Sequence, residues 1–308
     1  MFESEIQQYS EYRDNWNKAG APDFSKGVIT NTQNIAKYLS IIDNIQPKIT
    51  PTIKNMIWIE WEKENRYLKL EISEVSYKFF DNKNSDKETW VFLPEQVHLV
   101  INKIKMFHYD SPKRAVLFSG AFNPPTIAHY HVCESALNTG LFDFVIMATS
   151  NQSFLDKKQA KIGGYSYLEK DRLNMLIEMT YQNPQILVFG IEEGYTYDVL
   201  CAVKEFFSFK DMYFALGSDK LQEIGRWGRH NKLLKQFNFY ILNRNDTIEY
   251  INEKCRELFS NVNYIIAENN DRYKDISATE VRRRIRANED FSDLVHKNVY
   301  NYLIHLSP

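Results

Sequence analysis

The chain has 308 residues and nearly balanced charge, with 38 Lys and Arg residues against 40 Asp and Glu residues. A formal net charge of −2 excludes a global field that would attract nucleic acid or an anionic membrane, so any anion must bind at a local site. The three cysteines, Cys133, Cys201 and Cys255, are widely spaced, which argues against a disulfide framework and a zinc knuckle and favours a reducing cytoplasm. The N-terminal segment is too polar for a signal peptide, and no run of about 18 apolar residues predicts a membrane span.

Residues 1–110 predict a small α+β domain. Residues 1–30 are polar and are expected to form a loosely held arm, whereas an apolar stripe within Thr32–Asn44 predicts a helix. Over residues 56–80 apolar and polar positions alternate, which predicts three antiparallel strands joined by short turns. A further helix is expected to begin at Pro94.

A polar linker, His108–Arg114, separates this region from a second predicted domain, residues 111–308. Strands and helices alternate throughout that second domain. The predicted strands are 115–120, 142–150, 185–192, 211–219, one that ends at Arg244, and 262–268. The predicted helices are those near 129–137, at 167–180 and 197–208, within 231–244, and at the C-terminal end. This alternation predicts an α/β fold with a doubly wound, Rossmann-like parallel sheet, accompanied by the smaller N-terminal α+β domain.

The first chemical signal is the segment SGAFNPPTIAHYHV, which lies between the first predicted strand of this sheet and the following helix. Gly120 and Ala121 are small enough to let a phosphate approach the backbone. Thr126 and His129 are three residues apart, so one helical turn places both side chains on the same side. The N-terminus of that helix adds partial positive charge. These residues predict a phosphate-binding site at the carboxyl end of the first strand.

The same segment resembles the GxFxPxHxGH signature of the nucleotidyltransferase superfamily, in its (T/H)xGH form. Within it, GAFNPPT is most similar to nicotinamide or nicotinate mononucleotide adenylyltransferases. The resemblance covers roughly residues 113–308 and implies that Phe122 and Asn123 join the preceding Gly-Ala pair in binding the nucleotide. Thr126 stands where many members have His, and Ala128 stands where Gly is usual. The first 110 residues carry no comparable signature.

A second signal, DISATEVRRRI, lies about 150 residues further along the chain. Ser277 followed by Glu280 predicts a capping box that begins a helix. The segment also resembles the ISxTxxR element of the same superfamily. That resemblance implies that the backbone at Ser277, Ala278 and Thr279, together with the Arg282 guanidinium, binds the triphosphate.

Two further segments are expected to contact the nucleotide. FALGSDKL resembles the GxDxL element of the family, which implies that Gly217 admits the ligand and that Asp219 accepts from a ribose hydroxyl. The alternative for Asp219 is a simple helix N-cap. Arg244 ends the fifth predicted strand, where the family often places an Arg that holds the nucleotide.

The resemblance also implies a set of acceptor-binding residues. Trp227 lies near the position of a family Trp that stacks on the pyridine ring, with a core position as the alternative. Thr196 and Tyr197 belong to YTYDVL, which resembles the loop whose backbone contacts the acceptor base. Lys157 and Lys158 follow the second strand, where relatives carry phosphate-binding lysines.

The mechanism that the resemblance implies is in-line attack of an acceptor 5′-phosphate on the α-phosphorus of ATP, with release of pyrophosphate. His129, assisted by Thr126, is expected to donate to the α-phosphate, and Arg282 to bind the β- and γ-phosphates. Mg²⁺ is expected to bridge phosphate oxygens with few protein ligands, so no protein metal site is predicted. The expected partners are ATP and a mononucleotide, without nucleic acid or membrane.

Two alternatives remain at this stage. A related enzyme would use another phosphorylated acceptor, such as phosphopantetheine, or CTP; the FNPPT sequence and Trp227 favour the mononucleotide, and CTP-dependent relatives usually read RTxGISTT where RYKDISAT stands here. A nucleotide-sensing regulatory protein is the second alternative, against which the presence of Thr126, His129 and Arg282 argues. The sequence leaves open the choice between amide and acid mononucleotide, the role of residues 1–110, the effect of Ala128 on nucleotide affinity, and the oligomeric state.

Overall fold

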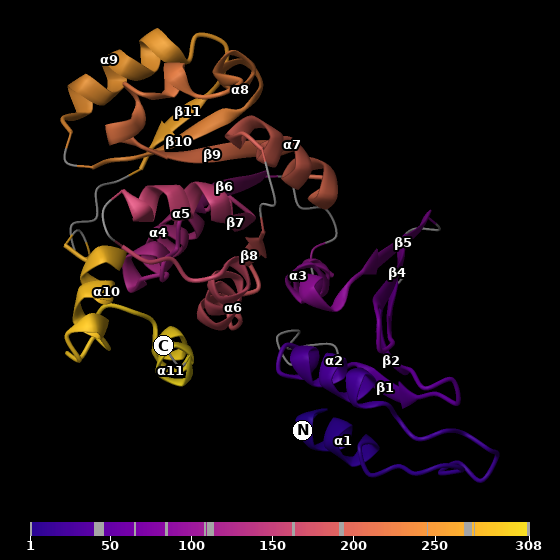
Figure 1. Ribbon diagram of the computed structural model, residues 1–308. Coiled ribbons are helices and arrows are strands. Elements are labelled where there is room, and N and C mark those ends of the chain that lie inside the picture. Colours follow the sequence, from indigo (N-terminus) through magenta and orange to yellow (C-terminus); the bar gives the residue numbers. More distant parts are fainter. Residues whose placement is uncertain are drawn as a thin grey trace. The chain divides into compact units, whose positions relative to one another are not determined.

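The chain divides into two compact units, Met1–Asp110 and Ser111–Pro308 (Figure 1). The computed structural model describes residues 2–39, 46–64, 66–83, 86–107, 109, 114–161, 164–190, 194–244, 246–267, 273 and 275–306. Most of the predicted linker His108–Arg114 lies outside the described residues.

The first unit contains a five-stranded antiparallel sheet in which sequential strands are neighbours. Its strands are β1 (Lys48–Pro51), β2 (Ile57–Lys63), β3 (Arg66–Ile72), β4 (Tyr77–Lys83) and β5 (Asp86–Phe92). The three predicted strands correspond to β2, β3 and β4 and are antiparallel as expected, whereas β1 and β5 were not predicted. Pro51 ends edge strand β1, where a missing N–H is tolerated. Val75 is 70% exposed in the turn before β4.

Alternation along the strands builds the core of this unit. On β2, Ile57, Ile59 and Trp61 are buried, and Ile59 pairs directly with the buried Leu70 of β3. Helices α2 (Lys26–Ala36) and α3 (Val97–Met106), the latter preceded by the 3₁₀ turn Pro94–Gln96, pack against this sheet. The helix predicted from Pro94 is therefore present.

The N-terminal segment is ordered by its own contacts, so the expectation of a loose arm over residues 1–30 was wrong. Helix α1 (Phe2–Tyr9) packs on α2, and Ser25 caps α2 by accepting from the Val28 N–H at 3.3 Å. The predicted helix Thr32–Asn44 overlaps only the end of α2, because this cap begins the helix earlier; residues 40–45 lie outside the described part of the chain. Aromatic rings from α1 and the following loop pack together: Tyr9, Tyr12, Trp16 and Phe24.

The second unit contains a parallel sheet of six described strands with the order β11-β10-β9-β6-β7-β8. The strands are β6 (Arg114–Gly120), β7 (Phe144–Thr149), β8 (Ile186–Phe189), β9 (Asp211–Gly217), β10 (Asn238–Leu242) and β11 (Tyr264–Ile266). Counted within the sheet, this is the 3-2-1-4-5-6 order of a dinucleotide-binding fold. The predicted α/β class with a parallel, Rossmann-like sheet flanked by helices is confirmed (Figure 1).

Helices connect the strands and follow the last one. They are α4 (Ile127–Asn138), α5 (Gln152–Ala160), α6 (Glu169–Thr180), α7 (Thr196–Phe207), α8 (His230–Gln236), α9 (Ile248–Leu258), α10 (Ala278–Arg286) and α11 (Lys297–His305). Short 3₁₀ turns occupy Ser218–Lys220 and Ile224–Arg226. Helices α5 and α9 were not predicted. Each begins at a side-chain cap: Asn151 accepts from the Phe154 N–H, and Thr247 accepts from the Tyr250 N–H.

An ion pair in the first unit gives a test of its stability. Arg66 binds Asp81 through two hydrogen bonds of 3.0 and 2.5 Å, with side chains only 13% and 10% exposed. Asp81→Ala should lower the free energy of unfolding by about 3 kcal/mol, because it leaves a nearly buried guanidinium uncompensated. Urea denaturation followed by tryptophan fluorescence measures this, since four of the five tryptophans (16, 58, 61 and 90) lie in residues 1–110. The exposed Glu62→Ala variant is the control, and a change in Asp81→Ala as small as the control's would contradict the expectation.

Candidate functional site

The fold defines one place where a crevice should open. Strand order reverses between β6 and β9, which are hydrogen-bonded neighbours. Ligands of open α/β sheets bind at this switch point, outside the carboxyl ends of the strands. The two loops that begin there carry the segments predicted from sequence, one after Gly120 and one after Gly217.

The loop after β6 is fixed largely by buried groups. Phe122 adopts a left-handed backbone (φ 45°) with its ring 1% exposed, packed edge-on against Phe118 and against the His129 imidazole at 5.1 Å between centroids. A Cβ on Gly120 would lie 3.0 Å from the Phe122 ring, so this glycine makes room for the phenyl group. Asn123 is 1% exposed, and its amide donates to the Tyr165 carbonyl and accepts from the Tyr167 N–H.

Helix α4 begins with a reciprocal arrangement between Thr126 and His129. The Thr126 N–H donates to Nδ1 of His129 at 2.9 Å, and the Thr126 hydroxyl lies 2.8 Å from the same nitrogen. The imidazole thus takes the place that Glu or Gln holds in a capping box. A ring nitrogen that accepts from a backbone N–H carries no proton, so the neutral ring is protonated at Nε2. Thr126 is fully buried and therefore orients the imidazole instead of facing solvent.

The imidazole is held neutral. Burial, reinforced by the nearby Arg244 guanidinium, lowers the pKa of His129 from 6.5 to about 4. At neutral pH His129 can donate one hydrogen bond from Nε2 without bringing a positive charge. The geometry is therefore compatible with His129 as a hydrogen-bond donor. Its catalytic role stays a prediction.

The two distant sequence signals meet in this unit. Arg282 of α10 is 5% exposed and donates through Nη1 to the Asn123 carbonyl at 2.5 Å, across 159 residues of chain. Its Nη2 donates to the Thr279 hydroxyl at 3.2 Å. A second link joins the Ile127 N–H to the Leu294 carbonyl at 3.0 Å. The start of α10 therefore lies against the loop that leads to His129.

The N-terminus of α10 is capped as predicted, but not by a full capping box. The Ser277 hydroxyl accepts from the Glu280 N–H at 3.2 Å. The Glu280 carboxylate, however, pairs with Arg283 and Arg284 at 2.9 and 3.1 Å. The N–H groups of Ala278 and Thr279 precede the first main-chain bond of the helix, from Val281 to Ser277, and are available to an anion.

The loops after β9 and β10 are joined by Ser218, which is 1% exposed. Its hydroxyl donates to the Asp246 carboxylate at 2.5 Å and accepts from the Arg244 N–H at 2.9 Å. Arg244 is exposed and lies close enough to His129 to influence its charge.

Asp219 lies within the 3₁₀ turn and pairs with Lys220 at 3.4 Å, so the alternative that it caps a helix was wrong. A Cβ on Gly217 would lie 2.3 Å from the Asp219 carboxylate oxygen.

The predicted acceptor residues are brought together in part. Trp227 is half-buried and packs edge-on against Phe214 at 6.1 Å. The start of α7 lies beside it, because a Cβ on Gly228 would meet the Tyr195 ring at 2.2 Å and Arg229 pairs with Asp198.

The remaining predicted acceptor residues are placed differently. Thr196 is half-buried at the first position of α7, whereas the Tyr197 hydroxyl donates to Gln236 of α8 at 2.8 Å. Lys157 and Lys158 are exposed in the last turn of α5, about 10 Å along that helix from the end of β7.

Two residues that support the site were missed by sequence reasoning. Arg172 is fully buried and binds the loops after β6 and β7, and Ser218 joins the loops after β9 and β10. Arg172 follows Glu and Asp on an apparently exposed helix, which resembles an ordinary charged face. Ser218 was passed over beside Gly217 and Asp219, although a small hydroxyl next to a strand end is a common loop anchor.

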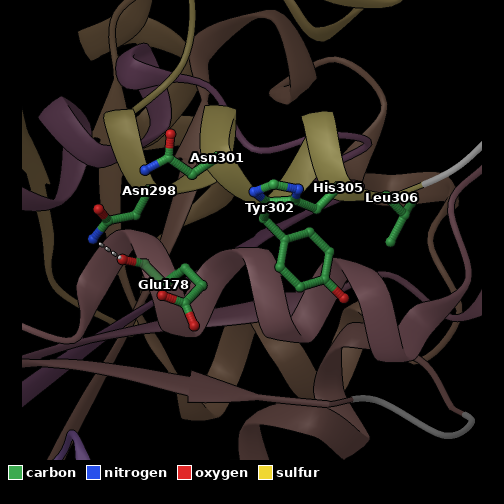
Figure 2. Close-up of a pocket in the computed structure, with 6 residues that line it drawn as sticks. All are labelled: Glu178, Asn298, Asn301, Tyr302, His305 and Leu306. Atoms are coloured by element: carbon green, nitrogen blue, oxygen red, sulfur yellow. Dashed lines mark hydrogen bonds between the residues drawn. The ribbon is translucent and has the colours of Figure 1, made fainter.

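One cavity in the described part of this unit lies apart from the predicted catalytic residues. A cavity of about 360 Å³ between α6 and α11 is lined by Glu178, Asn298, Asn301, Tyr302, His305 and Leu306. Figure 2 shows these side chains, with the Asn298 amide donating to the Glu178 carbonyl at 3.0 Å. Within the described ranges, no three His, Cys, Asp or Glu side chains gather closely enough to hold a metal ion. None of the described helices is long and apolar enough to cross a membrane.

Comparison with known proteins concerns the second unit. The family model for cytidylyltransferase-like proteins matches residues 117–284. A "Probable nicotinate-nucleotide adenylyltransferase" of Fusobacterium nucleatum is 29% identical over 195 residues, which are 60% of this chain and 94% of the relative. A protein of the same description from Caldicellulosiruptor saccharolyticus is 31% identical over 196 residues, or 62% of this chain and 96% of the relative. The solved structure of Plasmodium falciparum nicotinic acid mononucleotide adenylyltransferase complexed with NaAD is 23% identical, with a TM-score of 0.49, and the match covers 62% of this chain and 95% of that chain.

The protonation of His129 can be tested directly. Its imidazole should titrate by NMR with a midpoint of about 4, and Arg244→Met should raise this pKa because it removes a nearby positive charge. The folded pKa lies below the unfolded value of about 6.5, so this group's contribution to stability is fully present above pH 6.5 and is lost as the pH falls toward 4. Arg226→Met, at an exposed position, is the control. A midpoint near 6.5 in the wild type would show that the ring is not desolvated.

Proposed function

The chain belongs to the cytidylyltransferase-like family, and we propose that it transfers the adenylyl group of ATP to nicotinate mononucleotide. The products are pyrophosphate and a dinucleotide of the NAD biosynthetic route. The observation that carries this proposal is the hydrogen bond from Arg282 to the Asn123 carbonyl. It joins two distant signature segments into one site beside the oriented His129 imidazole.

The relatives support adenylyl transfer and the acid form of the acceptor. Those with 29% and 31% identity are described as nicotinate-nucleotide adenylyltransferases, and the matches cover 94% and 96% of their length. The family description mentions cytidylyl transfer, but no relative named above is described as using CTP. The N-terminus of α7, beside Trp227, offers the N–H groups of Thr196 and Tyr197 and the positive end of a helix dipole, which favour a carboxylate over a neutral amide.

In the proposed reaction His129 donates from Nε2 to an α-phosphate oxygen as negative charge builds there. Thr126 keeps Nδ1 as an acceptor, which fixes the tautomer and the direction of the Nε2–H bond. The Phe122 ring supports the imidazole from the side. A donor held in place before the reaction requires no reorganisation in the transition state, and this is the usual source of large electrostatic stabilisation.

The triphosphate is assigned to the N-terminus of α10 and to Arg244. The N–H groups of Ala278 and Thr279 can bind its β- and γ-phosphates, and the exposed Arg244 guanidinium supplies positive charge. Arg282 was expected to bind these phosphates directly. Because its guanidinium is buried and bonded to Asn123 and Thr279, we assign it the role of holding the two segments together.

The acceptor needs alignment but no general base. Its 5′-phosphate is already ionised at neutral pH, so in-line attack on the α-phosphorus requires that two anions be brought close and their charge offset. Trp227 is proposed to stack on the pyridine ring, which would set the distance of the nucleophile from ATP. Asp219 is proposed to accept from a ribose hydroxyl.

Mg²⁺ is proposed to arrive with ATP. Phosphate oxygens and water would supply most of its ligands, as is usual for Mg²⁺ bound with a nucleoside triphosphate. When bound, the ion would neutralise part of the triphosphate charge. We also propose a cytoplasmic location, which rests on the widely spaced cysteines.

The role of His129 has a direct test. His129→Ala should lower kcat about 100-fold or more, the size of effect seen when a transition-state donor is removed. The assay follows pyrophosphate release with ATP and nicotinate mononucleotide. His131→Ala on the same helix is the matched control, since His131 contacts Glu134 and Tyr273 and has no assigned role. Near-normal turnover in a folded His129→Ala variant would exclude this site.

The acceptor preference is a separate prediction. We expect kcat/KM to be about 10-fold or more higher with nicotinate mononucleotide than with nicotinamide mononucleotide, because hydrogen bonds to a charged group contribute roughly 1.5–3 kcal/mol. Initial rates with each acceptor, measured at fixed ATP, give the ratio. Equal rates, or a preference for the amide, would refute the proposed acid specificity while leaving adenylyl transfer intact. Phosphopantetheine in place of the mononucleotide, and CTP in place of ATP, serve as negative controls.

A further inference from the structure

Arg172 is a charged residue that the proposed reaction does not use directly, yet its side chain is fully buried. It projects from α6 into the space between two loops at the carboxyl edge of the sheet. Its Nη1 donates to the Ala121 carbonyl at 2.9 Å, and its Nη2 donates to the Ser150 carbonyl at 2.9 Å and to the Gln152 side-chain oxygen at 3.1 Å. One guanidinium therefore binds the segments that follow both β6 and β7.

This arrangement is costly for stability alone. Burial lowers the pKa of Arg172, and the carboxylates of Glu169 and Asp156 only partly oppose that effect. Its three acceptors among the described residues are neutral oxygens, and Nε of Arg172 is buried without a hydrogen-bond partner there. An apolar side chain of similar volume would avoid the desolvation of a charge. The guanidinium is better explained by the geometry that it imposes on the two loops.

The loop that Arg172 holds after β6 also contacts the His129 imidazole. Ala121 stands between Gly120, whose carbonyl accepts from the Ser150 N–H at 2.8 Å, and Phe122, whose left-handed backbone places its ring against His129. A shift of the Ala121 carbonyl would move Phe122, and with it one wall that supports the imidazole. Thr126 fixes Nδ1 but does not fix the position of the ring plane against that wall.

We infer that Arg172 is a positioning residue for adenylyl transfer, which holds the loop after β6 so that Phe122 supports the His129 imidazole at its working position. This inference rests on the proposed function, but it also concerns a geometry that exists without substrate. Arg172 makes no contact with the reacting atoms and acts only through Ala121 and Phe122.

The test uses Arg172→Lys in the full chain, because lysine keeps the charge but cannot bind both loops with the same planar fork. We expect kcat to fall by about 10- to 100-fold, the range for misplacement of a catalytic group by up to about 1 Å, while KM for ATP changes little. The matched control is Arg256→Lys, at an exposed position on α9, which should leave both constants unchanged. Activities are expressed per folded molecule, with the folded fraction measured by circular dichroism.

A second readout requires no turnover. In Arg172→Lys the NMR midpoint of His129 should rise from about 4 toward 6.5, because solvent reaches a less supported ring. A purely structural role would lower thermal stability but would leave both kcat per folded molecule and this midpoint as in the wild type, and that result would overturn the inference. If the wild type lacks adenylyl transfer, the proposed function fails, and the His129 midpoint alone then decides the role of Arg172.

Should Arg172→Lys fail to fold, Gln152→Ala provides the decision. Gln152 is half-buried and supplies only one of the three acceptors, so its loss should be tolerated. We expect a smaller change in the same direction, about a 3-fold lower kcat and a raised His129 midpoint, because the two bonds from Arg172 to the loop carbonyls remain and limit the displacement. A folded Gln152→Ala variant with wild-type kcat and midpoint would then overturn the inference.

Discussion

The contact between Arg282 and the Asn123 carbonyl is the constraint on which the site depends. The sheet alone places loops at the carboxyl ends of β6 and β9, but helix α10 follows β11, the last described strand of that sheet. A guanidinium that is 5% exposed must have its donors satisfied, and a main-chain carbonyl of the signature loop is one of its acceptors. Separation of the two segments would leave a buried charge without that partner. The same bond therefore stabilises the unit and brings helix α10 to the loop after β6, which is proposed to bind phosphate.

A second consequence concerns how the site balances charge. ATP and the acceptor are both anionic, and a protonated imidazole would attract them strongly before any reaction. Burial and the neighbouring Arg244 instead keep His129 neutral, so its Nε2–H acts as an oriented dipole. Fixed positive charge is supplied by Arg244 and by helix N-termini. In the proposed reaction, this separation would let the imidazole strengthen its hydrogen bond as charge develops, which would favour the transition state over the ground state.

The parts of the fold that were predictable are those with a local pattern. Alternation of apolar strands and helices predicted the parallel sheet, and Ser277 predicted the beginning of α10. The five-stranded sheet of the first unit was only partly predicted, since the seven residues of β5, DKETWVF, begin with charges and lack clear alternation. Residues 1–30 were misjudged because their polarity hid the aromatic contacts of Tyr12 and Trp16. Where a segment is stabilised by contacts with distant parts of the chain, its local sequence does not indicate its structure.

Residues of the candidate site were easier to identify from the sequence than the partners that each of them binds. A motif shows that Thr126, Asn123 and Arg282 occur together, but not which atoms each will bind. In the structure their polar groups are largely bonded to one another or to main-chain groups, and Arg172 adds a further internal bond of this kind. The groups that remain for a ligand are mostly those that a motif does not display: an Nε2–H, the free N–H groups at a helix start, and one exposed guanidinium. In a site built in this way, most polar side chains hold the loops in fixed positions. Such rigidity would allow a few weak hydrogen-bond donors to stabilise a transition state.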